Sequence, residues 1–299
     1  MTEQKISPQS AATPDPAANH VVAGVDEIIA AATALTWAAR YDVARGLLGS
    51  AVSAVDGAEA ARRLALAAAA TAVHHDFRTV GPRWAPDAIA AAEIVAGHQD
   101  RWRLDFLELQ HDYGRELIGP DGNPSFGPQG RDPARAAALA QRAEALLASA
   151  SDMADAGWAA FYRGLIGDNL AGDRSGAPRW LAQSLEAAGQ AGDDYLAGEA
   201  LRHLGDHDEE AGELEQARVR WERSAELWAR IGNVTGVLAQ QILLAQLAVR
   251  EGRPAAGTAI AQEVSRWAGA LGLVLYQKHA DALLAGAAEA LPATEHDRS

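Results

Sequence analysis

Two histidines, His203 and His207, are spaced as metal-binding pairs are on a helix. Helical residues four apart lie on one side, and zinc peptidases hold their metal with two such histidines. In those enzymes a Glu directly follows the first His, whereas Leu204 stands there in this chain. A catalytic zinc site also needs a third protein ligand. The pattern therefore predicts two histidines on a polar helix face, with no metal and no other cofactor.

A second candidate for chemistry is the run His74-His75-Asp76, with His111-Asp112 further along the chain. A His–Asp pair suggests general acid–base catalysis. Adjacent residues of a helix point about 100° apart, so His74 and His75 cannot both face one site. The sequence has no serine-nucleophile motif, phosphate-binding loop or dinucleotide fingerprint. We therefore predict no catalytic residue here.

Two long segments, 78–86 and 119–132, combine aromatic and basic side chains with Gly and Pro. Turns of this length in a compact helical array are uncommon and are often functional. If both emerge on one edge of the molecule, their side chains are neighbours and could anchor a partner. In the alternative interpretation, Trp84 packs back onto the core. The side chains concerned are Arg78, Arg83, Trp84, Phe126 and Arg131.

Charge and composition restrict the class of protein. The chain has 40 acidic against 26 basic residues, a net charge of −14, so we expect neither nucleic acid nor an anionic membrane surface as a partner. It contains no Cys, which excludes disulfides and cysteine-based zinc sites. We recognise neither a signal peptide nor a transmembrane segment, and we predict a cytoplasmic protein.

Helices must position all of these residues, because apolar residues recur at helical spacing and no alternating strand pattern occurs. In the C-terminal half the pattern repeats every 40 residues: Gly172, Gly212 and Gly252 align, as do Gly192, Gly232 and Gly272. A glycine after a helix predicts a left-handed cap. Each unit is therefore a helix, a tight turn, a second helix and another turn. The repeat columns also predict a buried position for Trp158, Trp221, Trp228 and Trp267.

Leu204-Gly205, Gly212, Ala217, Trp221 and Ser224-Ala225 resemble the signature of tetratricopeptide repeats, in a long bacterial form of 40 residues. The resemblance covers about residues 158–272. It implies an all-α, right-handed superhelical solenoid of about six antiparallel hairpins with a C-terminal capping helix. We expect this repeat domain to span residues 24–291, between a disordered leader, 1–23, and a disordered tail, 292–299.

In tetratricopeptide units the first helix of each pair lines a concave groove. The resemblance therefore places a mixed polar set from three consecutive units in the groove: Arg163, Glu199, Arg202, His203, Asp206, Glu210, Gln246 and Arg250. Such a groove suits a protein or peptide segment, or a small polar ligand. We expect Arg83, Trp84 and Phe126 to close over one end of it. A solvated helix face with local ion pairs would have the same composition.

The sequence thus favours a binding, scaffold or regulatory protein over an enzyme. Two alternatives remain open. One is an enzyme of specialised metabolism on the same helical scaffold, with groove His, Asp or Glu residues as acid–base groups or metal ligands. The other is a regulator whose catalytic or DNA-binding module lies on another chain. Fold alone does not decide among them.

Overall fold

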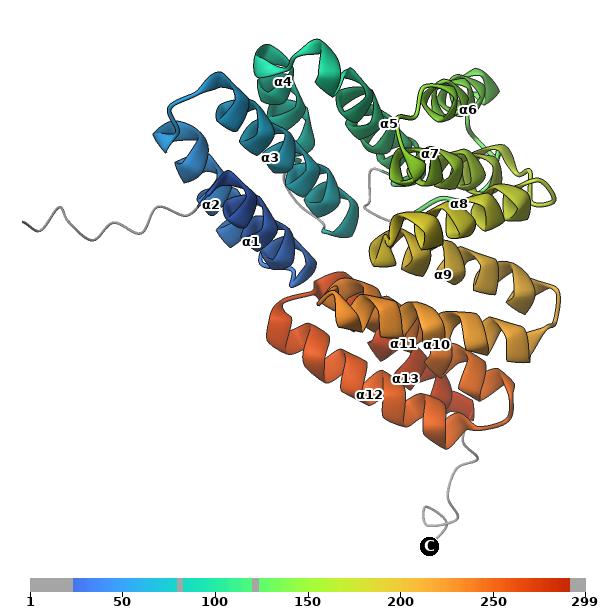
Figure 1. Cartoon of the computed structure of the whole chain (residues 1–299). Coiled ribbons are helices and arrows are strands. Elements are labelled where there is room, and N and C mark those ends of the chain that lie inside the picture. The colour runs from blue at the N-terminus through green and yellow to red at the C-terminus, as the bar shows by residue number, and fades with distance from the viewer. Residues whose placement is uncertain (1–23, 80–82, 120–123, 291–299) are drawn as a thin grey trace, which may run out of the picture.

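The computed structural model describes residues 24–79, 83–119 and 124–290. Thirteen α-helices follow one another in this part of the chain, and each packs against the next (Figure 1). These segments contain no β-strand, only an isolated bridge between Ile118 and Pro124. The predicted all-α class is confirmed. The predicted leader, 1–23, and tail, 292–299, lie outside the described residues.

The helices form six hairpins and a final single helix. The hairpins are α1 (Val25–Trp37) with α2 (Tyr41–Ala54), α3 (Ala58–Arg78) with α4 (Ala85–Val95), α5 (Arg101–Leu117) with α6 (Pro133–Ala148), α7 (Met153–Ile166) with α8 (Ala177–Ala191), α9 (Asp194–Glu210) with α10 (Leu214–Arg230), and α11 (Val234–Arg250) with α12 (Pro254–Leu271). The last helix is α13 (Val274–Ala290). A 3₁₀ turn, η1 (His98–Asp100), precedes α5, and a π-helical turn, η2 (Gly167–Ala171), extends α7.

The two series of glycines spaced 40 residues apart, which we call the glycine columns, lie in the turns between helices. All six glycines of the two columns have positive φ, from 69° to 84°, a conformation in which a Cβ would be strained. These turns reverse the chain within a few residues, so that each helix packs against its neighbour. The six positions are Gly172, Gly192, Gly212, Gly232, Gly252 and Gly272.

Two other glycines bring the paired helices α9 and α10 into close contact. The indole of Trp228 lies against Gly198, and that of Trp221 lies against Gly205, with no room for a Cβ at either position. Both indoles are buried, and each donates its N–H to a carbonyl of α9, Trp221 to Arg202 at 3.0 Å. The Leu-Gly pair of the repeat motif thus has a packing role.

The expectation that Trp267 is buried was wrong, because its side chain is 48% exposed on α12. The residues in the same repeat column, Ala187 and Leu227, are 3% and 5% exposed. Those two lie between consecutive complete hairpins. Trp267 lies on the last hairpin, which is followed in the described residues by the single helix α13, and its indole N–H donates to Glu263 of its own helix.

The solenoid curves until its first hairpins approach its last helices (Figure 1). Ala39, at the turn between α1 and α2, packs on a hydrophobic cluster formed by α11, α12 and α13. The ring of Trp37 lies 6.0 Å from that of Tyr195 on α9. The concave side is therefore bridged by side chains rather than open along its whole length.

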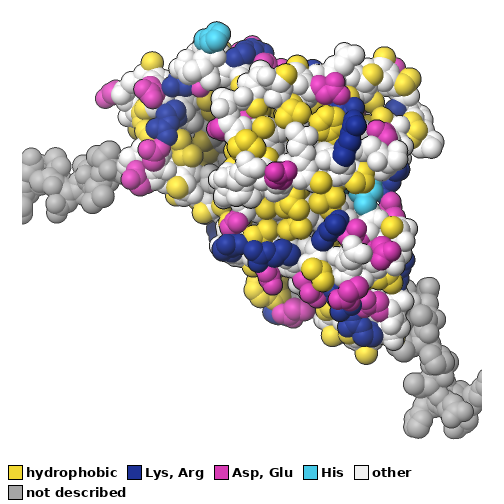
Figure 2. All heavy atoms as spheres, turned by 45° about the vertical axis from the view of Figure 1, so that its right-hand side comes forward, with side chains coloured by type: hydrophobic (Ala, Val, Ile, Leu, Met, Phe, Trp, Pro, Cys, Tyr) yellow, Lys and Arg dark blue, Asp and Glu magenta, His cyan; other side chains and the backbone are white. Residues whose placement is uncertain are grey.

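The surface is mixed in charge. Figure 2 shows acidic and basic side chains interspersed on one face, with hydrophobic side chains between them. Every helix in the described segments is too short or too polar to span a membrane.

Candidate functional site

A buried ion pair crosses the concave side. Arg78, the last residue of α3, donates to Glu199 on α9 at 2.7 Å, across 121 positions of sequence. Glu199 is 6% exposed. Beside the pair, the ring of Tyr195 lies 6.1 Å from that of His74 and 6.0 Å from that of Trp37. We call these five residues the interior bridge, since they connect the first two hairpins to α9.

His74 of the interior bridge has no hydrogen-bond partner among the described residues, although both ring nitrogens are buried. Burial, together with the smaller effect of the positive charge of Arg78, lowers the pKa of His74 to about 3. The imidazole is therefore neutral at pH 7, with one donor and one acceptor unused. Buried polar atoms are normally paired, so this position offers hydrogen bonds to an incoming polar group.

The polar residues of α9 form the second part of the site. We call Glu199, Arg202, His203, Asp206 and Glu210 the α9 face. Arg202 contacts the Nε2 atom of His203 at 2.8 Å, and because a guanidinium only donates, that nitrogen accepts and His203 is neutral. Burial, followed by the charge of Arg202, holds the pKa of His203 well below its usual value. Burial also raises the pKa of Asp206, against the opposing effect of Arg202.

The two histidines of α9 point to different partners. His207 Nε2 lies 3.2 Å from the buried carboxylate of Asp168 in η2, and Arg174 contacts the other oxygen of Asp168 at 2.8 Å. Arg174 also pairs with Glu210. Because His203 contacts Arg202 instead, the histidines do not share a ligand. The described residues contain no group of three His, Asp or Glu side chains that could hold a metal ion.

The remaining residues of the expected groove set lie apart from the α9 face or at its edge. Gln246 is exposed, and Arg250 pairs with Glu209 at the end of α9. Arg163 contacts Glu144 of α6 at 2.6 Å and stacks over Trp180, so it belongs to the space between α6 and α7.

Trp84 is folded onto α3. Its ring stacks on that of His75 with 3.6 Å between centroids, and Arg45 lies over the ring at 4.0 Å. Asp76 accepts hydrogen bonds from the backbone N–H of Trp84 and of Ala85, and so fixes the start of α4. Burial alone would raise the pKa of Asp76, but the hydrogen bonds from His75 and these N–H groups hold it below its usual value. The His75–Asp76 pair thus has a structural role beneath Trp84.

The other long turn is fixed by Arg131. This side chain donates to the carbonyls of Glu116, Ser125 and Gly127, so the turn is bound to the end of α5. Phe126 is 62% exposed, and Arg83 is also exposed, donating to the carbonyl of Asp76. Arg78 was expected beside these residues of the two long turns, but its side chain lies in the interior bridge.

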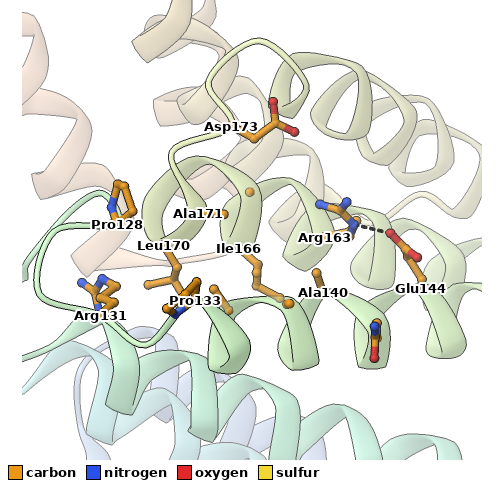
Figure 3. Close-up of a pocket in the computed structure, with 14 residues that line it drawn as sticks. Pro128, Arg131, Pro133, Ala140, Glu144, Arg163, Ile166, Leu170, Ala171 and Asp173 are labelled. Carbon is orange, nitrogen blue, oxygen red and sulfur yellow. Dashed lines mark hydrogen bonds and ion pairs between the residues drawn. The ribbon is translucent and has the colours of Figure 1, made fainter.

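A cavity of about 370 Å³ opens between α6 and α7, and sequence reasoning missed it (Figure 3). Only the unusual length of segment 119–132 pointed to this region, since that segment supplies one end of the cavity. We call the cavity the α6–α7 slot. Its lining residues are Pro128, Arg131, Pro133, Ala136, Ala137, Ala140, Gln141, Glu144, Arg163, Ile166, Gly167, Leu170, Ala171 and Asp173.

Comparisons with known proteins support the fold. The chain matches no protein-family model and no curated protein sequence. A similar solved structure is described as the "Crystal Structure of Rap Protein Complexed with Competence and Sporulation Factor". The two share 11% sequence identity with a TM-score of 0.50, over 89% of this chain and 85% of that one. At this identity the likeness concerns the fold alone: the arrangement of helices is similar to that of a Rap protein.

Proposed function

We propose that the chain is a tetratricopeptide-like regulatory or scaffold protein that binds an extended segment of a protein partner between the interior bridge and the α9 face. The observation that carries the proposal is the unpartnered His74 beside the buried Arg78–Glu199 pair. The fold likeness supports a binding role, since the similar Rap protein was crystallised with a factor bound.

An extended peptide presents backbone N–H and C=O groups that need partners. On one side, His74 has one unused donor and one unused acceptor beneath the concave surface, and a segment reaches them when the packed rings of Tyr41 and Tyr195 move aside. On the other side, Arg202 and Asp206 are about one-third exposed and can add charged hydrogen bonds. The neighbouring rings of Trp37 and Tyr195 offer apolar area for side chains of the segment. The site thus combines backbone recognition with side-chain specificity.

The proposal is tested by selecting peptides from a random display library on the full-length protein. Selected peptides should bind with an affinity that falls at least tenfold in Arg202→Ala and in Asp206→Asn. The matched control is Glu222→Ala, which removes an exposed carboxylate from α10 and should leave the affinity unchanged. Peptides that bind all three variants like the wild type would place the binding surface elsewhere.

Among the aromatic and basic side chains expected to anchor a partner from the two long turns, Phe126 and Arg83 are the exposed ones. We expect Phe126→Ala to weaken the same selected peptides if that turn contacts them. Trp84→Ala is a poorer test of contact, because Trp84 covers His75 and its loss would also disturb α3.

A further inference from the structure

The α6–α7 slot has the size and character of a small-molecule site. Its floor consists of Ile166 and Leu170, which are almost completely buried. Small side chains such as Ala136, Ala140 and Gly167 leave the space between the helices unfilled. The volume of about 370 Å³ lies within the range of about 300–1,000 Å³ that small-molecule pockets occupy. An apolar group can therefore enter without displacing a helix.

Fixed elements close the slot at both ends (Figure 3). At one end the Glu144–Arg163 pair crosses from α6 to α7 at 2.6 Å. At the other, the long turn docks on η2, where the Gly127 N–H donates to the Asn169 carbonyl at 2.8 Å. Pro128 lies so close to Gly172 that a Cβ there would meet it at 3.0 Å. The cavity is thus bounded by hydrogen-bonded structure on both sides.

The slot contains a carboxylate oxygen without a hydrogen bond from the described residues, while both of its guanidinium groups already have partners. Arg131 already donates to three backbone carbonyls, and Arg163 is engaged by Glu144 and by the ring of Trp180. The Glu144 carboxylate is 50% exposed and uses one oxygen for Arg163, while no described group hydrogen-bonds to the other. The exposed amide of Gln141 lies one helical turn away on the same wall.

We infer that the α6–α7 slot binds a small amphiphilic amine. Its apolar chain or ring lies along Ile166 and Leu170, and its ammonium group donates to the second oxygen of Glu144 and to the Gln141 carbonyl. The net charge of −14 on the whole chain favours the approach of a cation over that of an anion. This inference concerns different residues from the proposed peptide site, so either can fail without the other.

The test uses three probes with one chain and different head groups: n-octylamine, 1-octanol and octanoate, at pH 7. Binding is followed by NMR of ¹³C-methyl-labelled protein at the Ile166 and Leu170 methyl groups. The amine should bind most tightly and octanoate most weakly. In Glu144→Gln the amine should lose about tenfold in affinity, as expected for one charge-assisted hydrogen bond. Octanoate should then bind more tightly than the amine, because Arg163 is released.

Ala140→Phe should fill the slot and abolish the methyl shifts with all three probes. Its control is Ala138→Phe, on an exposed part of α6 outside the lining, which should bind like the wild type. If Ala140→Phe does not fold, Ala137→Phe fills the slot from the same wall. The inference is overturned if no probe shifts these methyl groups, if octanoate binds the wild type most tightly, or if the filled variant binds normally.

Discussion

Removing the carboxylate of Glu199 should destabilise the fold by several kcal/mol. The Arg78 and Glu199 side chains are 18% and 9% exposed, and a single 2.7 Å contact joins them. Removing one member of such a pair costs about 3–5 kcal/mol, because the other charge stays buried. We therefore expect Glu199→Gln and Arg78→Met each to lower the free energy of unfolding by about 3 kcal/mol. The double variant should be more stable than additivity predicts, by about 1.5–3 kcal/mol.

The four proteins of this double-mutant cycle are compared by urea denaturation monitored with circular dichroism. Hydrogen exchange adds a local readout: amides of α1, α2 and α3 should exchange faster in either single variant, because the pair connects these helices to α9. Asp42→Asn is the control, since it removes an exposed pair with Arg45 and should cost under about 0.5 kcal/mol. A coupling below about 0.5 kcal/mol, or unchanged exchange in α1–α3, would refute the role assigned to the pair.

Three further predictions concern other parts of the fold. Between about pH 6.5 and pH 3 the unfolded state binds a proton at His74 that the native state does not. The free energy of unfolding should therefore decrease as the pH is lowered, by up to about 1.4 kcal/mol per pH unit, and His74→Phe should reduce this slope in urea titrations. Asp76→Asn should cost about 1–2 kcal/mol at pH 7, and the difference should vanish as the pH falls through the depressed pKa of Asp76, below about 3.9, as followed by thermal denaturation. Gly189→Ala, with open space at its Cβ position on α8, should stabilise by about 0.5–1 kcal/mol, whereas Gly198→Ala should destabilise by more than that because Trp228 occupies the space, as chemical denaturation would show.

The fold was largely predictable because its signals are local and repeated. Glycine columns 40 residues apart required the same turn three times, and the structure shows positive φ at each position. Trp267 shows where such reasoning fails. Its repeat column predicts a buried side chain, but burial depends on the neighbouring hairpin, and after this last hairpin the described residues hold only one helix; the side chain is 48% exposed.

The candidate site was predictable only for residues that share one helix. Glu199, Arg202, His203 and Asp206 lie together because they recur on α9 at helical spacing. The partner of Glu199 is Arg78, 121 residues away, and no local pattern specifies the curvature that brings α3 and α9 together. The α6–α7 slot depends on the π-helical turn η2 and on a docked loop, and neither follows from helical periodicity.

The interior bridge also has a mechanical consequence. The shape of a stacked-hairpin array is the sum of small rotations between neighbours, so an unlinked array behaves as a soft spring. A cross-link between distant coils fixes that sum, and here Arg78 and Glu199 supply it with one contact. Together with the packing of Ala39 on the α11–α13 cluster and the ring contacts of Tyr195, this pair limits how far the whole array can change its pitch.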